Sequence, residues 1–436
     1  MNRSMMAVLA AILAAGANAE LPERDGYTHM GVATCATSQC HGSAVPRDGS
    51  SVLQNEYVTW TQDDPHSRAY AVLSNAQSQA IASRLGLASA TSADICLDCH
   101  ADNVPKAQRG DRFQLSDGIG CEACHGGAEN WLASHYNTAT ASLESNRAAG
   151  MYPTHRVDAR GELCLSCHLG NRDKFATHEI MAAGHPRLAF ELDTFSELWR
   201  TAGRQPHYQP DADYSDRKGG VNHLYTWAAG VILESRKRLQ LVASERFAGD
   251  RLFPELALYD CHACHRSMKS VQWRALPRHG GVGPGQPFLH DGALVMAMVV
   301  ARVISPSDAD AFESGLADLH RASSTDVAAT QAAARSLDAT LARLENALSP
   351  ARLGNRELAL LREVLATGAE GNYLDYISAE QAFMAVQMLV IEIGDPVLEE
   401  RLDRIADTLN DDERYRPSRF AAMLASLENP EHADEQ

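Results

Sequence analysis

Four short motifs constrain what this 436-residue chain can become more than any other feature of its sequence. Each has the form Cys-x-x-Cys-His, and the four end at His100, His125, His168 and His265. Two thiols about one helical turn apart can both add to the vinyl groups of one porphyrin, and the adjacent imidazole is then held under the iron as its proximal ligand. This spacing is the attachment signature of c-type haem. The sequence therefore predicts that these four histidines bind iron and that haem is attached through Cys96, Cys99, Cys121, Cys124, Cys164, Cys167, Cys261 and Cys264.

Two further cysteines, Cys35 and Cys40, lie outside these motifs and are followed directly by His41. Their Cys-x4-Cys-His pattern has the same ending with a longer loop, and looping out two extra residues still brings both thiols to one porphyrin. The alternative is a small disulfide, as is common in exported proteins, with His41 incidental. The histidine directly after the second cysteine favours haem. We therefore predict five haems c, or four if Cys35 and Cys40 form a disulfide.

Histidines are abundant enough to supply the sixth ligand of most irons. A low-spin haem in an electron carrier usually takes His or Met as that ligand, and thirteen of the 18 histidines remain after the five that follow a cysteine. This abundance predicts bis-histidine ligation. The first candidates for distal ligands, each with a surface or capping role as its alternative, are His66, His135, His155, His178 and His185.

The remaining histidines rank lower as ligands. Second candidates are His29, His223 and His290. His262 lies inside the last motif and is expected to face solvent. No ligand role is expected for the four other histidines, which are His207, His279, His320 and His432. The twelve methionines are expected mainly in the core.

Residues 1–19 have the pattern of a secretory signal. Arg3 precedes an apolar run at residues 5–15, and Ala-Asn-Ala at residues 17–19 is a small-residue cleavage site. The run is too short to span a bilayer, although an uncleaved N-terminal anchor is the alternative. No later run approaches membrane length. We expect an exported, periplasmic protein without a transmembrane segment after cleavage, which agrees with haem attachment outside the cytoplasm.

The chain is acidic, with a formal net charge of −17 at pH 7. This charge argues against nucleic acid or an anionic membrane as a partner, since both would repel it. It suits a basic redox protein, or it serves solubility alone.

Composition divides the mature chain into two parts. Residues 20–275 hold every cysteine and are rich in loops, so we predict a multihaem cytochrome c domain there. Residues 276–290 are rich in Gly and Pro and indicate a linker or wrapping loop. Residues 291–436 contain no cysteine and shift to Ala, Leu and Glu, which predicts a C-terminal helical bundle. Little β-structure is indicated, so the predicted fold is mainly α.

Individual helices can be placed from periodicity and end signals. Residues 51–88 are expected to be helical, and residues 221–246 to form an amphipathic helix. Ser378 and Gln381 resemble a capping box before an apolar run that Gly394 ends. Asp395 then begins the next helix, with proline after it.

Five segments resemble a known lineage. They are Trp-x5-His ending at His66, Gly-Ile-Gly-Cys-Glu-Ala-Cys-His-Gly-Gly at 118–127, Glu-Leu-Cys-Leu-Ser-Cys-His at 162–168, Ala-Gly-His-Pro at 183–186 and Tyr-Asp-Cys-His-Ala-Cys-His at 259–265. With them, residues 31–290 resemble the multihaem cytochromes c of the hydroxylamine oxidoreductase lineage. Within that lineage the likeness is to the tetrahaem electron carriers that accept electrons from hydroxylamine oxidoreductase in ammonia oxidisers.

The resemblance implies closely stacked haem pairs, mostly bis-histidine irons and electron transfer. It also implies that His66, His135 and His185 are distal ligands, and some members of the lineage keep one five-coordinate haem. This chain departs from the tetrahaem pattern through its predicted fifth haem and its long helical tail.

Three functions are compatible with these features. The first is an electron carrier between redox proteins, in which no substrate reaches a metal. The second is an oxidoreductase acting on a small nitrogen or sulfur compound at one five-coordinate haem, with proton donors such as Arg68, Tyr70 or His178. The third, compatible with the first, is a subunit of a larger redox complex that docks through its C-terminal helices. The sequence favours the carrier, because no Cys-x-x-Cys-Lys motif marks a catalytic haem like that of pentahaem nitrite reductases.

Overall fold

A computed structural model describes residues 20–48, 52–137, 139, 141–201, 208, 210–249, 253–265 and 274–427. The predicted signal at residues 1–19 lies outside this set, as do His207 and His432. Within these ranges the chain is mainly helical and forms no strand, which confirms the predicted fold class. Two isolated bridges join His29 to Arg109 and Tyr259 to Leu289.

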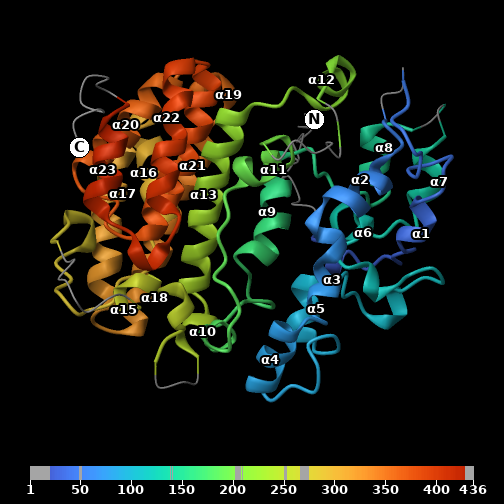
Figure 1. Cartoon of the computed structure of the whole chain (residues 1–436), viewed down its shortest axis with the longest axis horizontal. Coiled ribbons are helices and arrows are strands. Elements are labelled where there is room, and N and C mark those ends of the chain that lie inside the picture. The colour runs from blue at the N-terminus through green and yellow to red at the C-terminus, as the bar shows by residue number, and fades with distance from the viewer. Residues whose placement is uncertain are drawn as a thin grey trace, which may run out of the picture.

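The molecule has two sides, a loop-rich N-terminal side of short helices and a C-terminal side of long helices (Figure 1). The short helices are α1 (Val32–Cys35), α2 (Glu56–Asp63), α3 (Ala69–Val72), α4 (Ala76–Arg84), α5 (Asp94–His100), α6 (Cys121–His125), α7 (Leu132–His135) and α8 (Leu143–Ala148). Between the two sides run α9 (Val157–His168), α10 (His178–Ala182), α11 (Leu192–Thr201) and α12 (Ala212–Lys218).

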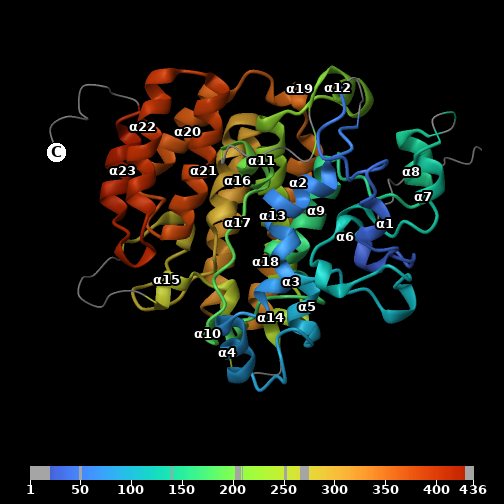
Figure 2. The same ribbon diagram turned by 45° about the vertical axis from the view of Figure 1, so that its right-hand side comes forward.

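The C-terminal side is a bundle of long helices, also visible in Figure 2. They are α13 (His223–Val242), α16 (Gly292–Ile304), α17 (Pro306–Ser323), α18 (Val327–Ala347), α20 (Glu357–Ala369), α21 (Tyr376–Ile393), α22 (Pro396–Ala406) and α23 (Pro417–Ala425). Three shorter helices, α14 (Glu245–Ala248), α15 (Cys261–Cys264) and α19 (Pro350–Leu353), join them.

The predicted helix at residues 51–88 is broken in the structure. It divides into α2, a 3-10 helix at Pro65–Arg68, α3 and α4. The Asp64 side chain caps the 3-10 helix, and the Asn75 side chain accepts a hydrogen bond from the Ser78 N–H to begin α4. Proline and capping side chains therefore end the helical path where periodicity alone would continue it.

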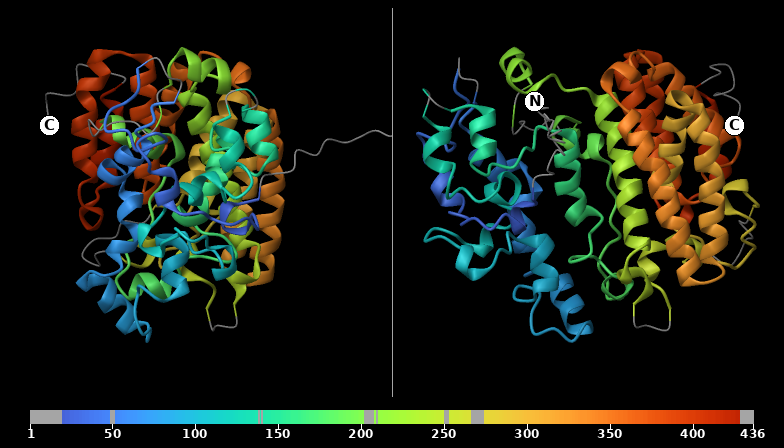
Figure 3. Two further views of the ribbon diagram at one scale, coloured as in Figure 1. Left: turned by 90° about the vertical axis from the view of Figure 1, so that its right-hand side faces the viewer. Right: turned by 180° about the vertical axis from the view of Figure 1, so that it is seen from behind.

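The main hydrophobic core crosses the predicted linker. It extends from Leu165 on α9 to Leu427 after α23, and α13 packs against α9, α16, α18 and α21. Trp227 on α13 is completely buried in it. The bundle is thus built from helices on both sides of residues 276–290. The right panel of Figure 3 shows α13, in green, beside the orange helices.

Helix α21 begins earlier than its sequence indicates. Asp375 is its N-cap and accepts a hydrogen bond from the Ser378 N–H at 2.7 Å, so the predicted capping box at Ser378 and Gln381 is wrong. The Gln381 amide instead donates to the Phe190 carbonyl at 2.8 Å. Gly394, with φ of +67°, ends the helix as predicted. By length and composition α21 could cross a membrane, but 67% of it is buried inside the molecule.

Candidate haem-binding site

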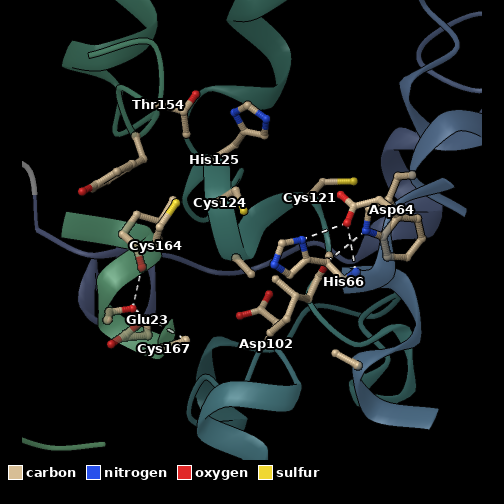
Figure 4. Close-up of a pocket in the computed structure, with 18 of the residues that line it drawn as sticks. Glu23, Asp64, His66, Asp102, Cys121, Cys124, His125, Thr154, Cys164 and Cys167 are labelled. Carbon is tan, nitrogen blue, oxygen red and sulfur yellow. Dashed lines mark hydrogen bonds and ion pairs between the residues drawn. The ribbon is translucent and has the colours of Figure 1, made fainter. Parts of the chain in front are cut away.

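A large cavity separates the short helices from α9 and α11. Its volume is about 2350 Å³, whereas a pocket for one small ligand usually holds about 300–1,000 Å³. The cavity can therefore hold several porphyrins. Figure 4 shows part of its wall. We number the five motifs along the chain, with Cys-x4-Cys-His at residues 35–41 as the first. Residues from the first four line the cavity: Cys35, Cys40, His41, Cys96, Cys99, His100, Cys121, Cys124, His125, Cys164, Cys167 and His168.

No disulfide joins Cys35 to Cys40, or any other two of the ten cysteines, in the structure. Thiols of different motifs lie within hydrogen-bonding reach: Cys35 of the first with Cys121 of the third, and Cys99 of the second with Cys167 of the fourth. These contacts, together with burial, raise the pKa of the Cys35 and Cys99 thiols. The first motif is therefore adjacent to the third, and the second to the fourth.

Four pairs of imidazole rings share one spacing. The ring centroids are 6.2 Å apart in each pair: His41 with His135, His66 with His168, His100 with His185, and His178 with His265. Metal–imidazole bonds are about 2 Å long, so two imidazoles on opposite faces of one iron hold their centroids about 6 Å apart. Each pair contains one histidine of a cysteine motif and one distant histidine. The residues therefore fit a haem iron between the rings of every pair.

Hydrogen bonds at Nδ1 orient five of these eight rings. His41 Nδ1 lies 2.8 Å from Glu56 Oε2, and His66 Nδ1 lies 2.9 Å from Asp64 Oδ1. A ring whose Nδ1–H is donated keeps Nε2 available for a metal, which is the usual arrangement of metal-binding histidines. Three other rings donate Nδ1–H to backbone carbonyls: His100 to Ala69 at 3.0 Å, His135 to Leu132 at 2.7 Å and His185 to Pro186 at 2.7 Å.

Burial favours the neutral form of three of the eight paired rings. It lowers the pKa of His168 to about 4, with a further contribution from His66. Burial likewise lowers the pKa of His100 and His135. A neutral imidazole is the form that binds a metal.

Four of the five first candidates for distal ligands are thus members of the pairs: His66, His135, His178 and His185. The fifth, His155, lines the cavity but forms no pair of this kind with another described residue. Burial and nearby cations, Lys218 first, lower its pKa to about 4.

The second candidates have other contacts. His29 is fully buried, and its Nδ1 lies 2.7 Å from Asp102 Oδ2. Burial opposes its charge, but the hydrogen bond to Asp102 and the nearby Asp25 carboxylate raise the pKa of His29 to about 10. His223 Nδ1 lies 3.0 Å from Asp193 Oδ1. Burial lowers the pKa of His290 well below its usual value.

The prediction that His262 faces solvent is wrong. Its side chain is only 16% exposed and lies 5.8 Å from the Tyr376 ring, measured between ring centroids. Burial lowers its pKa. The position between the two cysteines therefore directs this ring onto the C-terminal bundle, a contact that the motif itself cannot indicate.

Glu122, inside the third motif, is a positioning residue that the sequence did not reveal. Its carboxylate is 2% exposed and accepts hydrogen bonds from the backbone N–H groups of Met30, Gly31 and Ala128 at 2.7, 2.7 and 2.8 Å. Residues 30 and 31 lead directly into α1, which ends at Cys35. Glu122 thus ties the first motif to the third.

Lys174 has a similar place between the second and fourth motifs. Its ammonium donates to Glu23 Oε2 at 2.8 Å and to the Asp98 carbonyl at 3.3 Å. The only sequence signal for this role is that Lys174 follows the fourth motif by a few residues.

A buried polar cluster adjoins the fifth motif from the bundle side. Arg278 donates to Asp291 at 2.8 Å, to Asn372 at 2.9 Å and to Asp375 at 3.5 Å, and His320 Nε2 lies 3.2 Å from Asp291. The sequence indicated a linker around residue 278, so neither this cluster nor the burial of His320 was expected. The cluster holds residues 276–290 against α16 and α21.

Comparison with known families agrees with this chemistry. Residues 34–126 match the family model described as cytochrome c554 and c-prime. The match covers about a fifth of the chain and spans the first three motifs, including the Cys-x4-Cys-His motif at residues 35–41. No curated protein and no solved structure matches the chain. With its haem-attachment motifs, the chain is a c-type cytochrome that is similar to this family over residues 34–126.

Proposed function

We propose that this protein is an exported multihaem cytochrome that carries electrons between redox partners through five covalently attached haems. The four imidazole pairs at 6.2 Å carry the proposal. Each pair supplies two nitrogen ligands to one iron, and one member of each pair follows a cysteine that can hold the same porphyrin.

The pairs suggest which distal histidine serves which motif. His135 would serve the first motif, His185 the second, His66 the fourth and His178 the fifth, while His125 is the proximal ligand in the third. When bound, the haems supply one-electron chemistry between ferric and ferrous iron. In the four haems with a histidine pair, the chain's residues would hold both axial ligands in one geometry in both states, which keeps structural change on electron transfer small.

The adjacency of motifs supports the resemblance to the hydroxylamine oxidoreductase lineage. The first motif lies beside the third and the second beside the fourth, as stacked haem pairs require. We therefore propose that the chain is an electron carrier of that lineage with an additional haem and a helical bundle.

One observation favours the second candidate, an oxidoreductase acting on a small nitrogen or sulfur compound. Cationic side chains line the cavity: Arg147 and Lys218 lie near His155, and Arg160 also contributes to the wall. The Arg160 Nε is buried without a hydrogen-bond partner among the described residues. These cations suit an anionic substrate, but they suit haem propionates equally, so haem accessibility decides between the two functions.

The acidic chain is proposed to meet redox proteins in the periplasm, and its C-terminal helices are the proposed docking surface in a larger complex. The charge of −17 suits a partner with a basic surface. Co-purification with a second polypeptide would support the complex, and a freely diffusing monomer would count against it.

Haem counting and carbon monoxide binding test the proposed function on one sample. We expect a pyridine haemochrome assay and the intact mass to give five haems per chain, and the reduced spectra of the four haems with a histidine pair to stay unchanged under carbon monoxide. A stoichiometric shift of one haem would favour the oxidoreductase. The variant Cys35→Ser/Cys40→Ser provides the matched control, because it should lose one haem; a count of four in both proteins would overturn the fifth haem.

A further inference from the structure

One short segment carries two of the paired histidines. Helix α10 begins at His178, and the turn that follows it contains His185. His178 pairs with His265 of the fifth motif, whereas His185 pairs with His100 of the second. Helix α10 rises about 6 Å from His178 to its last residue at 1.5 Å per residue, and His185 follows three residues after its end. The segment therefore joins two metal positions at short range.

We propose that residues 177–187, the bridging segment, fix the electron path between the fifth haem and the other four, with the second haem as the connection. This inference rests on the proposed function. None of the described residues that line the large cavity belongs to the fifth motif, while His100 and His185 both line it. The fifth motif thus lies outside the cavity, and the bridging segment links it to the cavity wall.

At its first end the segment is held to the fifth motif. Glu255 Oε1 accepts hydrogen bonds from the His178 N–H at 2.8 Å and from the Ala257 N–H at 3.1 Å. The Glu255 side chain caps the 3-10 helix Leu256–Leu258, which leads into the motif at Cys261. One buried carboxylate therefore positions both the distal histidine and the approach to the proximal one.

At its second end the segment is held to the N-terminal side. Arg84 donates to the Ala183 carbonyl at 2.7 Å, and Gln77 donates to the Gly184 carbonyl at 3.1 Å. Both donors lie on α4. Gly184 has φ of +112°, and a Cβ there would lie 3.0 Å from Arg84 Nη1, so glycine permits this close approach.

The segment is also fixed to the bundle. Arg187 forms two parallel hydrogen bonds with Glu380 on α21, at 2.8 and 2.7 Å. A bidentate pair of this kind restricts orientation as well as distance. Contacts to the fifth motif, to α4 and to α21 therefore hold the two histidines at a constant separation.

Because the bridging segment holds its two histidines at one separation, the irons that they would bind interact electrostatically. With haem bound, the His100–His185 pair would hold one iron and the His178–His265 pair the other, and transfer between them would oxidise one iron and reduce the other by one electron. Because two charges this close interact, the redox state of one iron changes the midpoint potential of the other. Irons that are further apart interact less.

A double-mutant cycle on midpoint potentials tests the bridging segment. Replacing an axial histidine by methionine raises the potential of its own haem. We compare His178→Met/His185→Met with His178→Met/His135→Met, in which the control histidine serves the first motif. Potentials are measured by redox titration followed by electron paramagnetic resonance. We expect the shifts to be non-additive in the first pair and additive in the control pair.

Equal non-additivity in both pairs, or additivity in both, would overturn the bridging proposal. Haem counts on the same samples separate this failure from failure of the proposed function. Five haems with additive shifts contradict the bridging segment alone, whereas fewer than five haems in the unmodified protein contradict the proposed function.

Glu255 offers a second test that does not touch a ligand. In Glu255→Ala the His178 N–H loses its acceptor, so we expect the electron paramagnetic resonance signal of one haem to shift. Glu255→Gln keeps an oxygen acceptor and should restore the signal. A signal unchanged in the alanine variant, or changed equally in both, would show that Glu255 does not position His178. The cycle above stays decisive if Glu255→Ala does not fold.

Discussion

Glu122 Oε2 accepts a hydrogen bond from the Gly31 N–H at 2.7 Å, across 91 residues of sequence. The same carboxylate also binds two other backbone N–H groups. It therefore fixes the N-terminal segment that carries the first cysteine motif to the helix that forms the third.

Removing this carboxylate should destabilise the fold. In Glu122→Ala three backbone donors lose their acceptor, and an unsatisfied buried donor costs about 1–3 kcal/mol. We expect the free energy of unfolding to fall by about 3 kcal/mol or more, measured by urea unfolding of the holoprotein. Glu122→Gln should lose less, because its amide oxygen still accepts. The exposed Glu400 provides the control, since Glu400→Ala should change the value by under about 0.5 kcal/mol.

The carboxylate that binds the His41 ring should tune one potential. Glu56 makes the imidazole a stronger donor, which favours ferric iron. In Glu56→Gln we expect the midpoint potential of one haem to rise, and a tenfold loss of preference for the ferric state corresponds to about 59 mV. Asp64→Asn should act in the same way on the haem of His66. Potentials unchanged in both variants would contradict a ligand role for the two rings.

His29 should make stability depend on pH. Its pKa is raised from 6.5 to about 10 in the folded protein, so the folded state binds a proton more tightly than the unfolded state. The stabilisation is fully present below pH 6.5, falls as the pH rises and is lost above about pH 10. Urea midpoints of the unmodified protein should therefore decline between pH 6 and pH 9, and those of His29→Asn should decline less steeply. Parallel slopes in the two proteins would contradict this role.

Arg278 should be essential to the C-terminal bundle. Its removal leaves the carboxylates of Asp291 and Asp375 buried without their cation. Breaking a buried ion pair in this way costs about 3–5 kcal/mol, so we expect Arg278→Ala to lower the thermal midpoint strongly. Arg414→Ala is the matched control, because the Arg414 side chain is 86% exposed. Similar midpoints for the two variants would show that the cluster contributes little.

The sequence revealed the chemistry better than the geometry. Cysteine spacing identified the motifs, and proximity to a motif or a tryptophan singled out His66, His135, His178 and His185. The sequence could not indicate that His66 faces His168, because that pairing depends on how segments 102 residues apart are packed. The match over residues 34–126 supports the haem chemistry, while the ligand assignments stay predictions.

Other features depended on tertiary contacts that no local pattern carries. Glu122 occupies a variable position of its motif, and Arg278 lies in a Gly/Pro-rich stretch that resembles a linker. The N-cap of α21 is Asp375 because its carboxylate also meets Arg278 and Ser378, although Ser378 had the better local pattern.

The uneven distribution of the hydrophobic core bears on how the protein matures. The main core lies in α9 and the helices after it, whereas the N-terminal side has a separate cluster of only five buried residues, Leu73, Ala82, Ala90, Leu97 and Ala101. Under the proposed function, porphyrins supply the remaining apolar contacts there. The C-terminal bundle can therefore reach its final packing before the cofactors are inserted, and the part of the chain that is synthesised first completes its folding last.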